Sequence, residues 1–204
     1  MTVERGTQER ILAAAKAEFL EKGFKSASLR NIVKNAGVTT GALYGYYAGK
    51  EELFAAITGE VYDHLMSRYK AALRAFADLA PQEQLRHMGE AGRDCMEELL
   101  LYMYDHKTES RLILQCAQGT RCENLMDELV ELELDATKKY REVLRGLGRS
   151  VPETDPRLEH ILVTGMMNAY FEMVIHDMPL DDAMMYLQEL NDFYTAGWQK
   201  IMGQ

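Results

Sequence analysis

Apolar residues recur every three or four positions along almost the whole chain, and no segment alternates apolar and polar residues as a strand would. This spacing places apolar side chains on one face of an α-helix. Only four prolines occur in 204 residues, and all of them follow residue 80. The pattern therefore predicts an all-α protein.

Glycines, prolines and capping residues divide this pattern into about nine helices. The fourth of them begins at Lys50 and runs to Pro81, a length of roughly 45 Å at 1.5 Å per residue. We expect three short helices in a unit over residues 1–49, followed by a helical bundle over residues 50–204. The predicted helices span about 7–22, 28–37, 38–47, 50–80, 84–106, 109–117, 123–146, 156–177 and 181–202.

The charge is distributed unevenly along the chain. The whole protein carries 23 basic and 32 acidic residues, a net charge of -9. Residues 1–55 hold eight of the basic and six of the acidic residues, which gives +2, and the remaining 15 and 26 give -11. An N-terminal segment of this charge can approach phosphates, whereas the acidic remainder repels them.

Targeting and metal-binding signals are weak. The first twenty residues have no continuous apolar stretch, and the most apolar segment, residues 161–175, contains Asn168 and Glu172. We therefore expect a cytoplasmic protein without a membrane span. Three cysteines form no disulfide framework, and no Cys or His pair has ligand spacing, so we expect no metal and no cofactor.

The most informative segment runs from Ser28 to Tyr47. Two short predicted helices meet there at Gly37, where glycine supplies a left-handed backbone without a Cβ penalty. Such a helix pair can place its second helix in the major groove of DNA, although similar corners also occur in enzymes and scaffolds. The residues predicted to pack this unit together are Ile32, Ala36, Val38, Leu43, Phe19, Phe24 and Leu53.

The second helix of this pair is expected to expose hydroxyl, glycine and aromatic groups, which suit close approach to base edges, thymine methyls and phosphates. These groups belong to Thr39, Thr40, Gly41 and Tyr44. Ser28 and Thr39 lie at predicted helix N-termini, where backbone N–H groups favour a phosphate. Lys50 is a further candidate for a phosphate contact.

A series of short motifs surrounds this segment, and through them residues 8–57 resemble the TetR family of bacterial transcriptional regulators. The motifs are Arg10–Ala15, Phe19, Gly23-Phe24, Ser28–Ile32, Ala36–Val38, Gly41–Tyr44, Tyr47 and Lys50–Leu53. The resemblance implies an all-helical homodimer, a palindromic DNA operator, a C-terminal effector pocket and repression relieved by ligand. It departs from the family at Val33, which replaces alanine, and at Tyr47, which replaces phenylalanine.

The resemblance places Thr39, Thr40, Gly41 and Tyr44 on the recognition helix, and Ser28, Tyr46 and Lys50 at phosphate-contact positions. With the residues above, it completes the predicted nucleic-acid interface. The predicted DNA-binding residues are Ser28, Arg30, Thr39, Thr40, Gly41, Tyr44, Tyr46 and Lys50.

The last two predicted helices are apolar on more than one face, so each needs cover on more than one side. We expect them to form a dimer seam, a four-helix bundle about a two-fold axis. The alternative is that they form the core of a monomer. The predicted interface residues are Leu162, Ala169, Met173, Leu187, Tyr194 and Trp198.

Thirteen methionines are many for this length. Methionine adapts to irregular apolar shapes, so the central helices are expected to hold a cavity for a small apolar or aromatic effector. The alternative is that these methionines only fill the core. The predicted lining residues are Tyr62, Met66, Met96, Leu99, Met103, Cys116, Met126, Met166 and Tyr170.

Two other kinds of function compete with this interpretation. An α-helical enzyme would need converging acid, base or nucleophilic groups, and the sequence contains no motif for them, so we expect no catalytic activity. A regulator that responds to a protein partner would need no cavity. The sequence favours a ligand-relieved repressor that binds double-stranded operator DNA as a homodimer.

Overall fold

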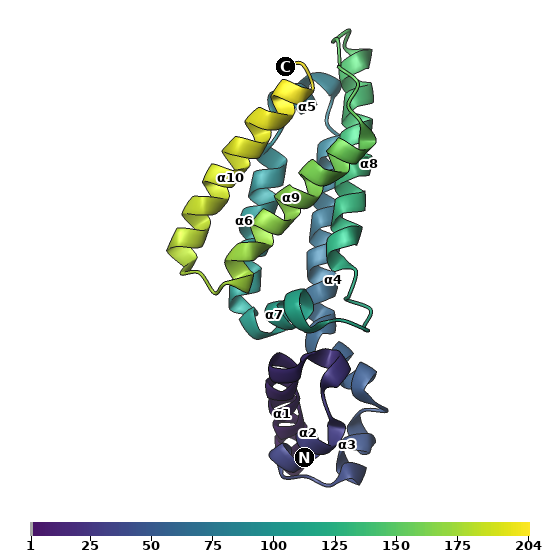
Figure 1. The fold of residues 1–204 in the computed structure, drawn as a ribbon, viewed down its shortest axis with the longest axis vertical. Coiled ribbons are helices and arrows are strands. Elements are labelled where there is room, and N and C mark those ends of the chain that lie inside the picture. Colours follow the sequence, from purple (N-terminus) through teal and green to yellow (C-terminus); the bar gives the residue numbers. More distant parts are fainter. Residues whose placement is uncertain (1) are drawn as a thin grey trace. The chain divides into compact units, whose positions relative to one another are not determined.

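A computed structural model describes residues 2–204, and in this range the chain contains ten helices and no strand (Figure 1). The prediction of an all-α protein is confirmed. The helices are α1 (Thr2–Ser26), α2 (Leu29–Ala36), α3 (Thr40–Tyr46), α4 (Lys50–Ala77), α5 (Pro81–Arg86), α6 (Glu90–Asp105), α7 (Lys107–Cys116), α8 (Leu125–Gly146), α9 (Pro156–Ile175) and α10 (Leu180–Ile201).

The structure has ten helices where about nine were predicted, because two helices, α5 and α6, take the place of the single helix predicted over residues 84–106. Pro81 begins the short helix α5, because its fixed φ suits the first helical position. The chain breaks again before α6 at Gly89, which has φ 88°. A Cβ at Gly89 would lie 2.6 Å from Oγ1 of Thr195 on α10, so this break lets the backbone approach α10 closely.

The helices form two compact units. One unit contains the chain up to Asp63 together with His106–Leu125, and we call it the N-terminal unit. The other contains His64–Asp105 and Met126–Gln204, and we call it the C-terminal unit. The helix α4 contributes to both. The predicted boundary after residue 49 divides the chain by expected function and stays a prediction.

In the N-terminal unit, α1 packs against α2, α3 and α7. The rings of Phe19, Phe24 and Phe54 meet at its centre, with centroids 5.1 to 5.9 Å apart. Most of the predicted packing residues are buried, namely Ile32, Ala36, Leu43, Phe19, Phe24 and Leu53, while Val38 is half-buried. The prediction of a core closed by α1 and the start of α4 is confirmed.

The turn between α2 and α3 is built around Gly37, which has φ 62° and ψ 39°. Its N–H donates to the carbonyl of Lys34 at 3.2 Å, and the N–H of Val38 donates to the carbonyl of Val33 at 3.1 Å. This pair of bonds is a Schellman motif, which satisfies the last carbonyls of a helix. Arg10 of α1 donates to the carbonyl of Ala36 at 3.2 Å, so α1 also holds this end of α2.

A buried carboxylate holds the other end of α2. Glu18 of α1 is 5% exposed and accepts hydrogen bonds from the backbone N–H of Ser28 at 3.0 Å and from Nδ2 of Asn31 at 3.1 Å. Negative charge is favourable at a helix N-terminus, where backbone N–H groups lack partners. Both ends of α2 are therefore anchored to α1, a role of Arg10 and Glu18 that was not predicted from the sequence.

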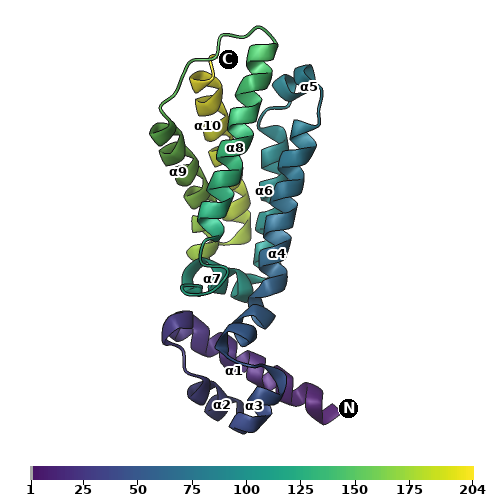
Figure 2. The same cartoon turned by 90° about the vertical axis from the view of Figure 1, so that its right-hand side faces the viewer.

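In the C-terminal unit, α6, α9 and α10 pack against one another, and α8 lies alongside α4 in both views (Figures 1 and 2). The rings of Phe76 on α4 and Tyr140 on α8 are 5.6 Å apart. The guanidinium of Arg141 pairs with Glu159 at 2.6 Å and so connects α8 to α9. None of the helices within residues 2–204 is both long and apolar enough to cross a membrane.

We expect Gly37→Ala to lower the free energy of unfolding by about 1–2 kcal/mol, because alanine must adopt the left-handed conformation there. Crowding does not contribute, since the nearest atom to a Cβ at this position is Nη1 of Arg10 at 3.6 Å. Urea unfolding followed by circular dichroism measures the change.

Gly45→Ala is the matched control, because Gly45 is helical and a Cβ there meets nothing within 4 Å. It should raise the free energy of unfolding by up to about 1 kcal/mol. Wild-type stability in Gly37→Ala would contradict the role of the turn.

Candidate nucleic-acid interface and internal cavity

The helix α3 presents most of its side chains to solvent. Its one buried residue is Leu43, whereas Thr40, Gly41 and Tyr44 are exposed, Tyr44 by 54%. Thr39 stands at the N-cap, and its Oγ1 accepts a hydrogen bond from the N–H of Ala42 at 3.1 Å. Figure 2 shows α3 beside α2 in the N-terminal unit. Leu43 therefore anchors α3 while its polar face stays open.

The eight predicted DNA-binding residues all lie in the N-terminal unit, on or next to α2 and α3 or at the start of α4. Five of them are exposed to solvent: Arg30, Thr39, Thr40, Gly41 and Tyr44. Ser28, Tyr46 and Lys50 are half-buried. Ser28 occupies the N-cap of α2, its side chain makes no capping hydrogen bond, and its backbone N–H donates to Glu18. DNA contact by these residues stays a prediction.

Lys50 has a structural role that its sequence position did not indicate. Its ammonium group donates to the carbonyls of Lys25 and Ala27, both at 3.1 Å, and lies 4.7 Å from the ring centroid of Phe24. An ammonium group has three protons, so one remains for another acceptor. Lys50 thus fixes the chain between α1 and α2, and its predicted contact with a phosphate uses the remaining proton.

Tyr47 ends α3 with a buried ring that is 5% exposed. Its hydroxyl accepts a hydrogen bond from Nε2 of Gln8 at 3.1 Å. A buried tyrosine hydroxyl needs such a partner. The tyrosine found here in place of phenylalanine therefore gains a polar contact between α1 and the end of α3.

The predicted dimer residues divide by burial. Met173, Leu187 and Trp198 are buried within the chain, at 2%, 1% and 8% exposure. Leu162, Ala169 and Tyr194 are half-buried. The apolar stripe used for the prediction includes residues that face the chain's own bundle, because inward and outward apolar faces look alike in sequence. The large apolar residues exposed on α9 and α10 are Leu158, Ile161, Leu180, Met185, Tyr186 and Phe193.

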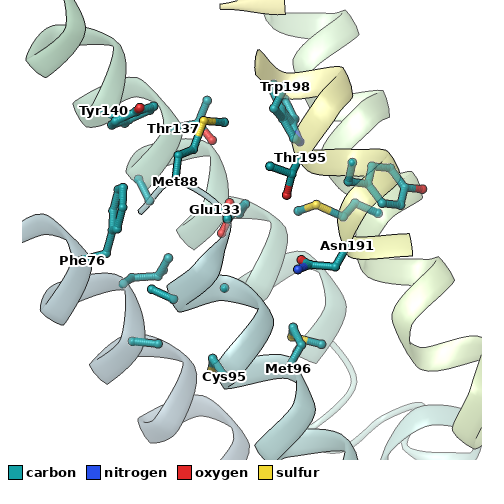
Figure 3. A pocket seen from close by; sticks show the side chains of 18 of the residues that line it. Phe76, Met88, Cys95, Met96, Glu133, Thr137, Tyr140, Asn191, Thr195 and Trp198 are labelled. Carbon is teal, nitrogen blue, oxygen red and sulfur yellow. The ribbon is translucent and has the colours of Figure 1, made fainter. Parts of the chain in front are cut away.

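The C-terminal unit contains a cavity of about 150 Å³, lined by residues of α4, α6, α8, α9 and α10 and of the break before α6 (Figure 3). Of the predicted lining residues, it brings together Met96, Met166 and Tyr170. Tyr62 and Cys116 belong to the N-terminal unit, so they do not line this cavity. The remaining four also lie outside its lining: Met66, Leu99 and Met103 are buried, and Met126 is half-buried.

The cavity also contains polar groups that were not predicted from the sequence. Glu133 and Asn191 line it, and Figure 3 shows them among Phe76, Met96 and Trp198. The hydroxyl of Tyr69 donates to Oε2 of Glu133 at 2.5 Å. Burial raises the pKa of Glu133 above its ordinary value, and the hydrogen bond from Tyr69 opposes this shift. A single glutamate in the charged pattern of the α8 sequence carries no signal that it faces inward.

Residues 11–57 match the sequence profile described as bacterial regulatory proteins, tetR family. The chain is 29% identical over 126 residues to the HTH-type transcriptional activator FasR of Mycolicibacterium smegmatis, which is 59% of this chain and 57% of FasR. It is 31% identical over 87 residues to the HTH-type transcriptional repressor KstR2 of Mycobacterium tuberculosis, which is 43% of this chain and 42% of KstR2. The matches thus span about half the length of these relatives.

The likeness in fold extends further along the chain. The crystal structure of the transcriptional regulator FadR from Bacillus subtilis, in complex with stearoyl-CoA, superposes with a TM-score of 0.55 over 93% of this chain and 98% of FadR, at 15% identity. At this identity the likeness concerns the fold. Residues 11–57 therefore carry the sequence pattern of bacterial regulatory proteins of the tetR family, and the chain has the fold seen in FadR.

Proposed function

We propose that the protein is a transcriptional regulator that binds double-stranded operator DNA as a homodimer and releases it when a small molecule occupies the cavity. DNA binding is assigned to residues 1–49, and effector binding and dimerisation to residues 50–204. The observation that carries the proposal is the open polar face of α3, held by the buried Leu43 in a domain of the tetR type. FasR and KstR2, to which the chain is similar, are both named transcriptional regulators, which supports the proposal.

The exposed groups of α3 suit the major groove, which is wide enough for one α-helix. Thr40 and Tyr44 carry hydroxyl, methyl and aromatic groups that can contact base edges and thymine methyls. Gly41 has no side chain to hold the helix away from the bases. Arg30 on α2 and Lys50 on α4 supply positive charge for phosphates on either side.

The homodimer is proposed to form through α9 and α10. Ile161 on α9 is 64% exposed and Phe193 on α10 is 71% exposed, and exposed apolar groups of this size commonly mark an interface. A two-fold pair of recognition helices requires a palindromic operator with half-sites at least about 10 base pairs apart. We keep the predicted dimer seam on α9 and α10, but we assign its contacts to the outward-facing residues of these two helices.

The helix α4 is the proposed link between ligand and DNA, since it belongs to both units. Tyr69 and Phe76 in its second half line the cavity, and its first half packs in the N-terminal unit. A ligand that shifts α4 changes the spacing of the two recognition helices. A coupling of roughly 1–3 kcal/mol would change DNA affinity about 5- to 150-fold.

Other modes of action remain distinguishable by experiment. FasR is named an activator and KstR2 a repressor, so either sign of regulation occurs among the relatives. The cavity favours a small-molecule effector over a protein partner, because a protein partner needs no internal space. A protein that binds operator DNA would act in the cytoplasm. A turnover assay with an identified ligand would reveal an enzyme.

Thr40→Ala is expected to relax the base preference at one position of each half-site, roughly fivefold, because a side chain that contacts a base edge is removed. The exposed position of Thr40 leaves folding unaffected. Sequencing of duplexes selected from a random pool measures the preference. Gln82→Ala, which changes an exposed residue of α5, is the control. An unchanged base preference in Thr40→Ala would show that Thr40 does not contact a base.

Lys50→Met keeps the aliphatic stem beside Phe24 and removes the charge. If the remaining proton binds a phosphate, the slope of log K against log salt concentration should become less negative by about 0.9 for each bound copy of Lys50. Binding to a labelled duplex between 50 and about 200 mM salt measures this slope. The control is Lys138→Met, at an exposed position of α8. A lower affinity with an unchanged slope would leave Lys50 with its positioning role alone.

Phe193→Glu should convert the dimer to a monomer at micromolar concentration, because it places two charges at a proposed apolar seam. Sedimentation equilibrium measures the mass, and affinity for a palindromic duplex should fall with it. The matched control is Leu101→Glu, since Leu101 on α6 is also exposed, by 45%. The Leu101→Glu protein should remain dimeric. A dimeric Phe193→Glu protein would contradict this seam.

A further inference from the structure

The cavity of the C-terminal unit has an acid in its wall and no base. Glu133 of α8 lines it, and its lining residues include no lysine, arginine or histidine. Glu133 is half-buried, and its side chain borders the cavity. Within residues 2–204, Glu133 has no ion-pair partner, and Tyr69 is the one side chain that donates a hydrogen bond to it.

An unpaired carboxylate in such a place is costly for folding. Removing a charge from water without a partner disfavours the charged form, which is why burial raises the pKa of Glu133. A glutamine could accept the same hydrogen bond from Tyr69 without this cost. Glutamate at this position therefore has no advantage over glutamine for packing. It would have an advantage if a ligand supplied a partner for its charge.

The titratable groups that face Glu133 add no positive charge. They are Tyr69 from α4, Cys95 from α6 and Tyr170 from α9. Burial raises the pKa of Cys95 to about 11 and raises the pKa values of Tyr69 and Tyr170, so all three are neutral at physiological pH. An anionic ligand would meet the carboxylate with nothing to offset it, whereas a cation would be paired.

The other walls suit the same ligand. Aromatic rings from three helices, Phe76, Tyr140 and Trp198, line the cavity (Figure 3). Aromatic faces attract cations, and they also cover the apolar part of a ligand. An apolar cavity of about 150 Å³ can hold a benzene ring, and the volume of this cavity is about the same.

We propose that the cavity binds a compact aromatic cation, an amine or a quaternary ammonium, whose charge pairs with Glu133 while its ring lies between the aromatic walls. The proposal rests on the proposed function in that this ligand would be the effector. It selects ligands by charge: cations are bound, uncharged analogues are bound weakly, and anions are excluded.

Trp198 provides a direct measurement, because it is the chain's single tryptophan and it lines the cavity. Its fluorescence can be followed as benzyltrimethylammonium, its uncharged carbon isostere neopentylbenzene, or the anion phenylacetate is added to the full chain. We expect saturable quenching by benzyltrimethylammonium, with an affinity at least tenfold above that of either other probe.

Glu133→Gln tests the residue itself. It should lower the affinity for benzyltrimethylammonium at least tenfold and leave the affinity for neopentylbenzene unchanged. Glu131→Gln is the matched control, since Glu131 is an exposed carboxylate on the same helix, and its affinity for the cation should equal that of the wild type. Circular dichroism confirms that each variant is folded.

The pH dependence of the wild-type protein gives an answer even if Glu133→Gln fails to fold. The charge of benzyltrimethylammonium does not titrate, so its affinity should fall as the pH is lowered through the raised pKa of Glu133. The affinity for neopentylbenzene should stay constant over the same range, because Tyr69, Cys95 and Tyr170 remain protonated there.

Three results would overturn the proposal: no saturable quenching by benzyltrimethylammonium, equal or tighter binding of neopentylbenzene or phenylacetate, or full affinity for the cation in Glu133→Gln. These measurements contain no DNA. Failure of the proposed regulator function would instead appear as a lack of preference for any duplex over random competitor, so the two failures are separable.

Discussion

The left-handed turn at Gly37 is the constraint on which the placement of α3 depends. Its backbone bonds close α2, Arg10 holds the same end from α1, and Glu18 holds the opposite end. Since both ends of α2 are tied to α1, the direction in which the chain leaves Gly37 is set. Leu43 then needs only to enter the core for the remaining side chains of α3 to face solvent.

Each unit contains a glutamate that is removed from solvent at least in part, and the two glutamates have different hydrogen-bond partners. In the N-terminal unit, Glu18 is buried but satisfied by hydrogen bonds at a helix N-terminus, where negative charge is favourable. In the C-terminal unit, Glu133 borders a cavity and has only the hydroxyl of Tyr69. The first arrangement fixes the start of α2, and the second leaves the carboxyl group of Glu133 with a single hydrogen-bond donor. The proposed regulator would use the fixed end of α2 to present α3 to DNA and the carboxyl group of Glu133 to bind its ligand.

Sequence patterns predicted the N-terminal unit better than the C-terminal unit. Gly37, Leu43 and the phenylalanines report local geometry or strong burial, so their positions follow from spacing alone. The cavity does not follow from spacing, because Met66 and Met103 fill the core while Met96 and Met166 line the empty space. Methionine fits both settings, and its position along a helix does not say which neighbour it will meet.

The sequence by itself determined that the chain is helical, that a glycine turn joins two short helices near the N-terminus, and which residues share a face on the second of them. These features depend on contacts between neighbours in the chain, for which residue spacing is sufficient. The tertiary structure alone decided that Lys50 binds two carbonyls, that Trp198 faces inward, and that Glu133 enters a cavity without a base. Each of these depends on which distant helices meet, because burial and pairing are set by the neighbours that packing brings together.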